Sequence, residues 1–315
     1  MELDILGFNS ASFGSKTMTT SSRLSILTLP FPLHCATMRL LARRAALFRS
    51  PVIFKISPVV RPYSSAPATS TLPPRWLSDV RSRIGKCIMF GISPTQASEA
   101  GSILQEISRD WRELVAGSEG YLTGEGRRGL YKQEVVWGEM VCDSIGHVNN
   151  VMYTRYAESA RCNWTRNFAA MDPAHAKQWM ELITPKSVGL ILRSIKTDYK
   201  FPMKWPDRIT VLHKLRNKPT TESDHFVLDV LILSELHRRP AARCVEDIVV
   251  YDYTQAKKSA LPSFMIERFK ETFAMQETVK EECGKRVEGI LERVRRLEKE
   301  SWDREGAVED LGSAR

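Results

Sequence analysis

The stretch "DSIGHVNNVMYTRYAESAR", residues 143–161, decides how the rest of this sequence is interpreted. An acidic residue, a Gly-His pair and two adjacent asparagines precede a segment whose apolar residues recur with helical spacing. Polar residues packed this densely before a helix have two explanations. Either Asp143 or Asn149 caps the helix, since Asp and Asn are preferred N-caps, or the loop is a reaction centre.

Patterns on either side of this stretch predict a mostly antiparallel sheet packed on one long helix. A strand-like run at 130–142 precedes the expected helix, which covers about 150–169. Four more strand-like runs follow, separated by short segments rich in Pro, Asn and Asp, at 187–201, 208–217, 225–236 and 242–253. Consecutive strands joined by short links exclude a doubly wound parallel sheet, so the predicted fold class is α+β.

Helices are expected on both flanks of this sheet. A first helix is predicted within 73–90 and a second within 91–117, where Ser93 fits the N-cap and Pro94 the first turn. The charged tail from Ser263 is also predicted to be helical. Its narrow apolar stripe favours either docking on the chain's own domain or a short coiled coil. The stripe consists of Val287, Ile290, Val294 and Leu297.

These patterns divide the chain into four regions. They are a targeting or disordered segment at 1–72, a helical extension at 73–128, the sheet-and-helix domain at 129–262 and a charged helical tail at 263–315. The first 78 residues hold nine Lys and Arg against two acidic residues and so carry +7 of the net charge of +9. The other 237 residues are nearly neutral, so no nucleic-acid partner is predicted.

The N-terminal region has the composition of a mitochondrial transit peptide. Its section "MRLLARRAALFRSPVIFKISPVVRPYSSAPATSTLPP", residues 38–74, combines Arg with Leu, Ala and Phe and lacks acidic residues. Arg43, Arg44 and Arg49 interrupt the apolar run, which excludes a secretory signal and a membrane span. The alternative is a disordered basic tail that carries no targeting signal. The six cysteines show no C-x-x-C pair, so free thiols in a reducing compartment such as the matrix are expected.

Three motifs together resemble the hotdog fold, in particular acyl-CoA thioesterases of the 4-hydroxybenzoyl-CoA thioesterase type. They are "WGEM" at 137–140, the stretch at 143–161, and "DYKFPMKWPDRITV" at 198–211. The resemblance covers about residues 130–262. It implies an antiparallel sheet wrapped around one long central helix and a homodimer or tetramer. It also implies an acyl-CoA substrate, or an acyl-carrier-protein thioester, with no cofactor besides the coenzyme A of the substrate.

The same resemblance assigns roles in the motif. Asp143 is the catalytic carboxylate, as nucleophile or general base, and the backbone N–H of Asn150 polarises the thioester carbonyl. The first amides of a helix lack internal partners, so they can stabilise negative charge on that oxygen. His147 and Asn149 resemble catalytic positions of plant acyl-carrier thioesterases, although Ile145 stands where those enzymes have Asn.

Glu158 is the reserve catalytic carboxylate, because some hotdog thioesterases use a carboxylate on the helix. The alternative is a purely structural role for each residue: an ion pair of Glu158 with Arg155 or Arg161, and a structural hydrogen bond for His147.

Four further residues are expected to contact substrate. Gly146 lets the loop pass close to the substrate, and Tyr153 is either a core residue or part of the site. Lys200 and Lys204 can meet the phosphates of coenzyme A, or belong to a solvated strand face.

Two other functions remain open. The sequence departs from the family at one point, because Val141 and Cys142 separate "WGEM" from Asp143, whereas in relatives the acidic residue usually follows this motif directly. That insertion and the added helices are also compatible with an inactive hotdog subunit that binds or assembles other proteins in the mitochondrion. A hydratase on the same fold fits less well, because the spacing from Asp143 to His147 is four rather than five.

Overall fold

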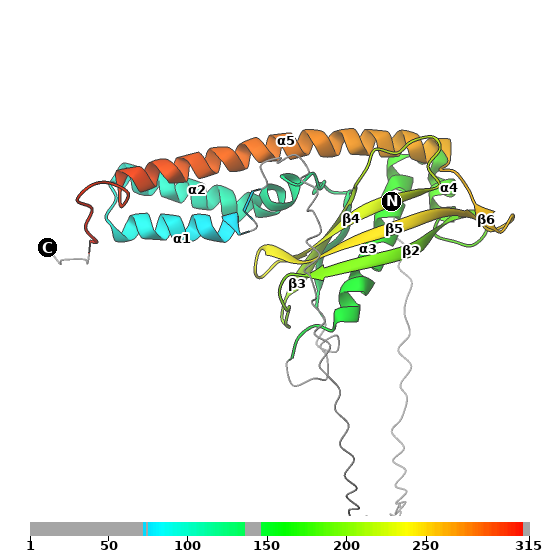
Figure 1. The fold of residues 1–315 in the computed structure, drawn as a ribbon, viewed down its shortest axis with the longest axis horizontal. Helices are drawn as coiled ribbons and strands as arrows, with labels where there is room; N and C mark the ends of the chain where they lie inside the picture. The colour runs from blue at the N-terminus through cyan, green and yellow to red at the C-terminus, as the bar shows by residue number, and fades with distance from the viewer. Residues whose placement is uncertain (1–71, 74, 136–145, 311–315) are drawn as a thin grey trace, which may run out of the picture. The chain divides into compact units, whose positions relative to one another are not determined.

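A computed structural model describes residues 72–73, 75–135 and 146–310, all within one compact unit, Pro67–Arg315. Its elements, shown in Figure 1, are α1 (Trp76–Met89), α2 (Pro94–Arg112), the π-helical turn η1 (Glu113–Gly117), β1 (Arg128–Glu134), α3 (Asn150–Met171), the 3-10 turn η3 (Pro173–His175), α4 (Ala176–Glu181), β2 (Val188–Tyr199), β3 (Arg208–Leu215), β4 (His225–Ser234), β5 (Arg239–Asp252), β6 (Lys257–Lys258) and α5 (Ser263–Glu300).

The strands form one antiparallel sheet in the order β1-β3-β4-β5-β2, with β6 paired to β5. The sheet curls around α3, as Figure 1 shows. This is the hotdog fold, so the predicted fold class is confirmed. The four strand-like runs that follow the helix in the sequence became β2 to β5.

The central helix α3 packs on the sheet through apolar residues at helical spacing. Its buried side chains include Tyr156, Ala157 and Trp164, which lie against alternate residues of the strands. β1 approaches the helix closely at Gly129, where a Cβ atom would lie 2.6 Å from the Cβ of Ala160. Glycine therefore allows the edge strand to sit directly on the helix.

A group of helices extends away from one end of the sheet. α1, α2 and the second half of α5 lie side by side in Figure 1, and we call these three segments the helical arm. Ser93 is the N-cap of α2, as predicted, and it forms a capping box with Gln96. Leu231 and Leu233 of β4 share one apolar cluster with the arm.

The tail helix docks on the chain itself. The apolar stripe of α5 is buried in the same cluster as the apolar residues of α1 and α2. On α1, Cys87 points into this cluster, whereas Ile88 is 54% exposed. Of the two explanations for the stripe, docking is therefore the one that the structure supports. No helix in the described ranges is both long and apolar enough to cross a bilayer.

Several expectations concern residues outside the described ranges. These are the targeting segment up to residue 71, "WGEM", the inserted Val141 and Cys142, and Asp143.

Candidate functional site

An open cleft of about 370 Å³ lies at the N-terminus of α3. It is lined by His147, Val148, Asn150, Tyr153, Tyr199, Lys200, Phe201 and Pro202. Four residues that the sequence nominated, His147, Asn150, Tyr153 and Lys200, thus meet in one place. They come from the loop before α3, from the helix itself and from the segment after β2.

The first turn of α3 is capped by its own sequence. The side-chain Oδ1 of Asn149 accepts a hydrogen bond from the N–H of Val151 at 3.0 Å. Capping is therefore a structural role of Asn149. None of the hydrogen bonds between described residues uses the N–H of Asn150. Asn150 itself lines the cleft.

Two hydrogen bonds hold the start of α3 and the loop before it against the segment after β2. The N–H of Val148 donates to the Met203 carbonyl at 2.9 Å, and the N–H of Met203 donates to the Tyr153 hydroxyl at 3.1 Å. Tyr153 is 2% exposed, and its burial raises the pKa of the phenol. Tyr153 is thus a core residue that also forms one wall of the cleft.

Tyr199 forms the facing wall of the cleft, and the sequence reasoning did not nominate it. Its ring packs edge-on against Tyr153 at a centroid distance of 5.2 Å, and its hydroxyl donates to the carbonyl oxygen of Asn150 at 3.2 Å. Burial raises the pKa of Tyr199. Behind the wall, burial raises the pKa of the Cys244 thiol to about 11, so this thiol is neutral near pH 7.

Gly146 has a left-handed backbone conformation, with φ of +62°. A Cβ atom at this position would meet nothing within 4 Å among the described residues. Here glycine serves the turn into the helix; a close approach to substrate stays a prediction. His147, half-buried, lines the cleft beside it.

Lys204 and Glu158 are not part of the cleft lining. Both side chains are exposed, and within the described ranges neither forms an ion pair. The suggested helix ion pair between Glu158 and Arg161 is wrong, because Arg161 pairs instead with Glu246 of β5 at 2.5 Å. The spacing of charges along one helix did not reveal a partner on the sheet.

The pair formed by Arg161 and Glu246 lies between α3 and the sheet. The Glu246 side chain is fully buried and that of Arg161 is 13% exposed. The second carboxylate oxygen of Glu246 is 3.5 Å from Nε2 of His213, which is 2% exposed on β3. Neither ring nitrogen of His213 has a hydrogen-bond partner among the described residues. The helix that carries the cleft is therefore anchored to the sheet by a buried charge pair.

Residues 135–269 match the family model of the Thioesterase-like superfamily. This segment, less than half of the chain, is therefore similar to thioesterase-like domains. No curated protein sequence matches this chain. In the described residues, His, Cys, Asp and Glu form no group of three or more that could hold a metal ion.

Solved structures similar to this chain include three bacterial thioesterases. A Thermus thermophilus thioesterase complexed with coenzyme A and Zn is 18% identical, with 49% of this chain and 98% of that chain covered and a TM-score of 0.37. The 1,4-dihydroxy-2-naphthoyl-CoA thioesterase of Synechocystis is 18% identical, with 44% and 93% covered and a TM-score of 0.34. The DHNA-CoA thioesterase of Staphylococcus aureus is 14% identical, with 47% and 90% covered and a TM-score of 0.35.

Proposed function

We propose that this chain hydrolyses an acyl-CoA thioester in the cleft at the N-terminus of α3. The observation that carries the proposal is the meeting of His147, Asn150, Tyr153 and Lys200 at a helix start whose first N–H has no partner among the described residues. The family match of residues 135–269 supports the same chemistry. A cleft of about 370 Å³ falls within the usual size of small-molecule sites.

In the proposed reaction, the thioester carbonyl oxygen accepts a hydrogen bond from the Asn150 N–H. This donor stabilises the negative charge that develops on the oxygen. Asp143 either attacks the carbonyl carbon or removes a proton from the attacking water. The carbon–sulfur bond then breaks, the sulfur leaves as the thiol of coenzyme A after it takes up a proton, and water supplies the oxygen of the acid product.

The walls of the cleft suggest how substrate is held. Tyr153 and Tyr199 present aromatic surface to the acyl group or the pantetheine arm. The exposed ammonium of Lys200 is placed to meet a phosphate of coenzyme A. Acyl carrier protein is the alternative carrier of the acyl group.

We place this activity in the mitochondrion because of the composition of residues 38–74. A homodimer or tetramer is proposed because β2, which ends at the cleft with Tyr199, is an edge strand. Pairing with a second subunit would satisfy the backbone groups along that edge.

The test is thiol release by the full chain from short, long and aromatic acyl-CoAs. Asp143→Asn is expected to lower kcat about 100-fold or more, since it removes the attacking or proton-accepting group. Glu222→Gln is the matched control, because its carboxylate is exposed outside the cleft lining, and its kcat is expected to stay within a few-fold of wild type. If the folded wild type releases no thiol from any substrate, the proposal is wrong and the inactive-subunit alternative replaces it.

A further inference from the structure

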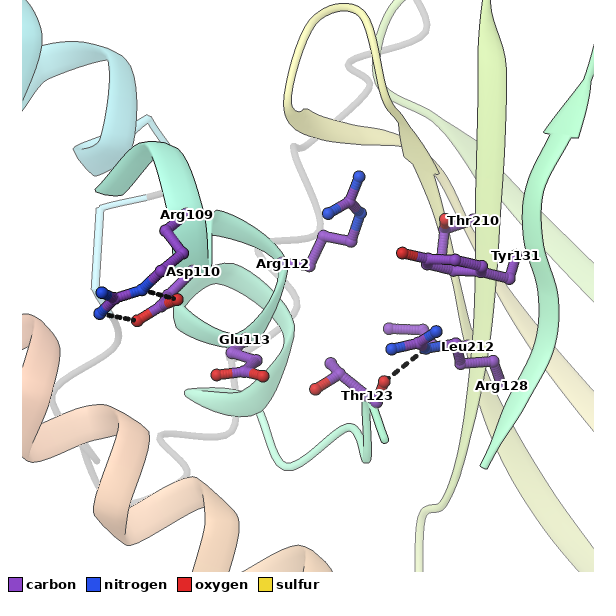
Figure 2. A pocket seen from close by; sticks show the side chains of 9 residues that line it. All are labelled: Arg109, Asp110, Arg112, Glu113, Thr123, Arg128, Tyr131, Thr210 and Leu212. Atoms are coloured by element: carbon purple, nitrogen blue, oxygen red, sulfur yellow. Dashed lines mark hydrogen bonds and ion pairs between the residues drawn. The ribbon is translucent and has the colours of Figure 1, made fainter. Parts of the chain in front are cut away.

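A second cavity, of about 200 Å³, lies between the helical arm and the edge of the sheet. Figure 2 shows its walls: the end of α2 and η1 on one side, β1 and β3 on the other, and the loop residue Thr123 below. β1 and β2 form opposite ends of the strand order, so this cavity is separate from the cleft beside Tyr199. None of its lining residues takes part in the chemical step proposed above.

Two of the three arginines that line this cavity are already neutralised. Nε of Arg109 donates to the Asp110 carboxylate at 2.8 Å. Arg112 makes a bidentate pair with Glu235, with 2.8 Å from Nε to Oε1, and this pair raises the pKa of the guanidinium. These two arginines therefore shape the cavity but leave little positive charge for a ligand.

Arg128 differs from the other two arginines. Its Nε donates to the carbonyl oxygen of Thr123 at 2.5 Å, and its guanidinium stacks on the Tyr131 ring at 3.9 Å. These contacts fix the group in place but do not neutralise it. Within the described ranges no carboxylate lies within 4.0 Å of Arg128, and its two terminal nitrogens donate to no described residue.

The acidic residues of the cavity are occupied elsewhere. Asp110 bonds to Arg109 and to Arg286, with 2.6 Å to the latter, and Glu113 lies 3.6 Å from Arg286. Both carboxylates of the cavity are therefore paired with arginines other than Arg128. Arg128 is therefore a fixed positive charge at the cavity with no carboxylate partner among the described residues.

Two neutral donors complete the set. In Figure 2 the hydroxyl of Tyr131 points from β1 toward the helical side, next to the Arg128 guanidinium, and Thr123 lies below them. Neither the Tyr131 hydroxyl nor the Thr123 hydroxyl forms a hydrogen bond with another described residue. Terminal guanidinium nitrogens and two hydroxyls on one cavity suit a tetrahedral oxyanion, whose several oxygens can accept all of them.

We propose that this cavity binds a phosphate group, with Arg128 donating from both terminal nitrogens and Tyr131 donating from its hydroxyl. The volume, below the roughly 300 Å³ of typical small-molecule pockets, fits a phosphate ion or the end of a phosphomonoester. Inorganic phosphate and the 3′-phosphate of coenzyme A are two sources of the same group.

The proposal is tested by calorimetric titration of the full chain with inorganic phosphate at low ionic strength. Wild type is expected to show saturable binding that sodium chloride at matched ionic strength does not reproduce. Arg128→Gln is expected to raise the Kd about 10- to 100-fold, because a charge-assisted pair is lost. Tyr131→Phe, which keeps the ring under Arg128, is expected to raise it about 2- to 10-fold.

Lys132→Gln is the matched control. Its ammonium lies 5.1 Å from the Tyr131 ring on the same strand but does not line the cavity, so the Kd is expected to change less than about threefold. No saturable binding by wild type, or equal binding by Arg128→Gln, overturns the proposal. If Arg128→Gln does not fold by circular dichroism, an unchanged Kd in Tyr131→Phe overturns it instead.

A coenzyme A titration distinguishes the two sources of phosphate. If coenzyme A displaces inorganic phosphate from wild type and Arg128→Gln abolishes that competition, the coenzyme's phosphate is a ligand of this cavity. If inorganic phosphate binds and coenzyme A does not compete, the ligand is a smaller phosphate compound. Thiol release by the Arg128→Gln variant at saturating acyl-CoA separates this site from the proposed hydrolysis. Its kcat is expected to stay near that of wild type because the reacting groups at α3 are unchanged, and only its KM is expected to rise if the coenzyme's phosphate is the ligand.

Discussion

The helical arm and the interface between α3 and the sheet both join arginine to carboxylate, in opposite surroundings. In the arm, Arg293 pairs with Glu99 at 2.6 Å and with Glu106 at 3.0 Å, and all three side chains are between 24% and 41% exposed. Under α3, Arg161 and Glu246 pair at 2.5 Å with 13% and 0% exposure. The same chemical contact is thus made once at a partly solvated surface and once in the core.

This difference in burial decides what each contact contributes. Exposed ion pairs are screened by water and salt and contribute little, so the apolar seam must hold the arm together. A buried pair gains little over an apolar pair, but removal of one partner leaves an uncompensated charge in a low dielectric. The core interface is therefore the more sensitive to a single substitution.

The largest effect is expected from Arg161→Ala. The change leaves the fully buried carboxylate of Glu246 without its partner, and we expect a loss of about 3–5 kcal/mol in the free energy of unfolding. Urea denaturation followed by circular dichroism measures it. Arg155→Ala on the same helix is the control, since that side chain is exposed, and its change should stay within about 0.5 kcal/mol. A loss below about 1 kcal/mol for Arg161→Ala would remove the contrast between the regions.

An intermediate effect is expected in the apolar seam of the arm. Ile103 of α2 is 0% exposed in the cluster with α1 and α5, so Ile103→Ala creates a cavity and should cost about 2–4 kcal/mol in the same denaturation experiment. Ile88→Ala on α1 is the control, because that side chain is 54% exposed, and it should cost less than about 0.5 kcal/mol. Equal costs for the two variants would show that the arm is not held by this seam.

The smallest effect is expected from Arg293→Gln. Because its bonds to Glu99 and Glu106 are partly solvated, we expect a loss of about 0–1 kcal/mol that shrinks further as salt is raised. Denaturation at low and high sodium chloride measures both quantities. A loss above about 2 kcal/mol that is independent of salt would mean that the arm depends on its ion pairs as the core does.

Sequence patterns predicted the elements that arise from local interactions. Helical spacing and the capping preference of Asn placed α3 correctly, and Asn149 is its N-cap. The strand-like runs, separated by short segments rich in Pro and Asp, likewise placed β2 to β5. Three of the four nominated cleft residues, His147, Asn150 and Tyr153, were found because they lie within a few positions of one helix start.

Contacts across the sheet could not be predicted in this way. Glu246 is 85 residues from Arg161 and pairs with it only because β5 passes under α3 at that register. Helix spacing pointed to Glu158 as the partner instead. Tyr199 was missed for the same reason, since its place opposite Tyr153 depends on where β2 ends relative to the helix.

What the sequence by itself determined is the order and type of the elements and the polar start of α3, because backbone periodicity and capping act over a few residues. Only the tertiary structure decided which charges are paired and which are left free. The residues next to Arg128 and next to Arg161 in the chain include no acidic partner for either arginine. Packing buries one against Glu246 and leaves the other facing an open volume. Electrostatic interactions depend on distance and burial, and packing of distant segments sets both.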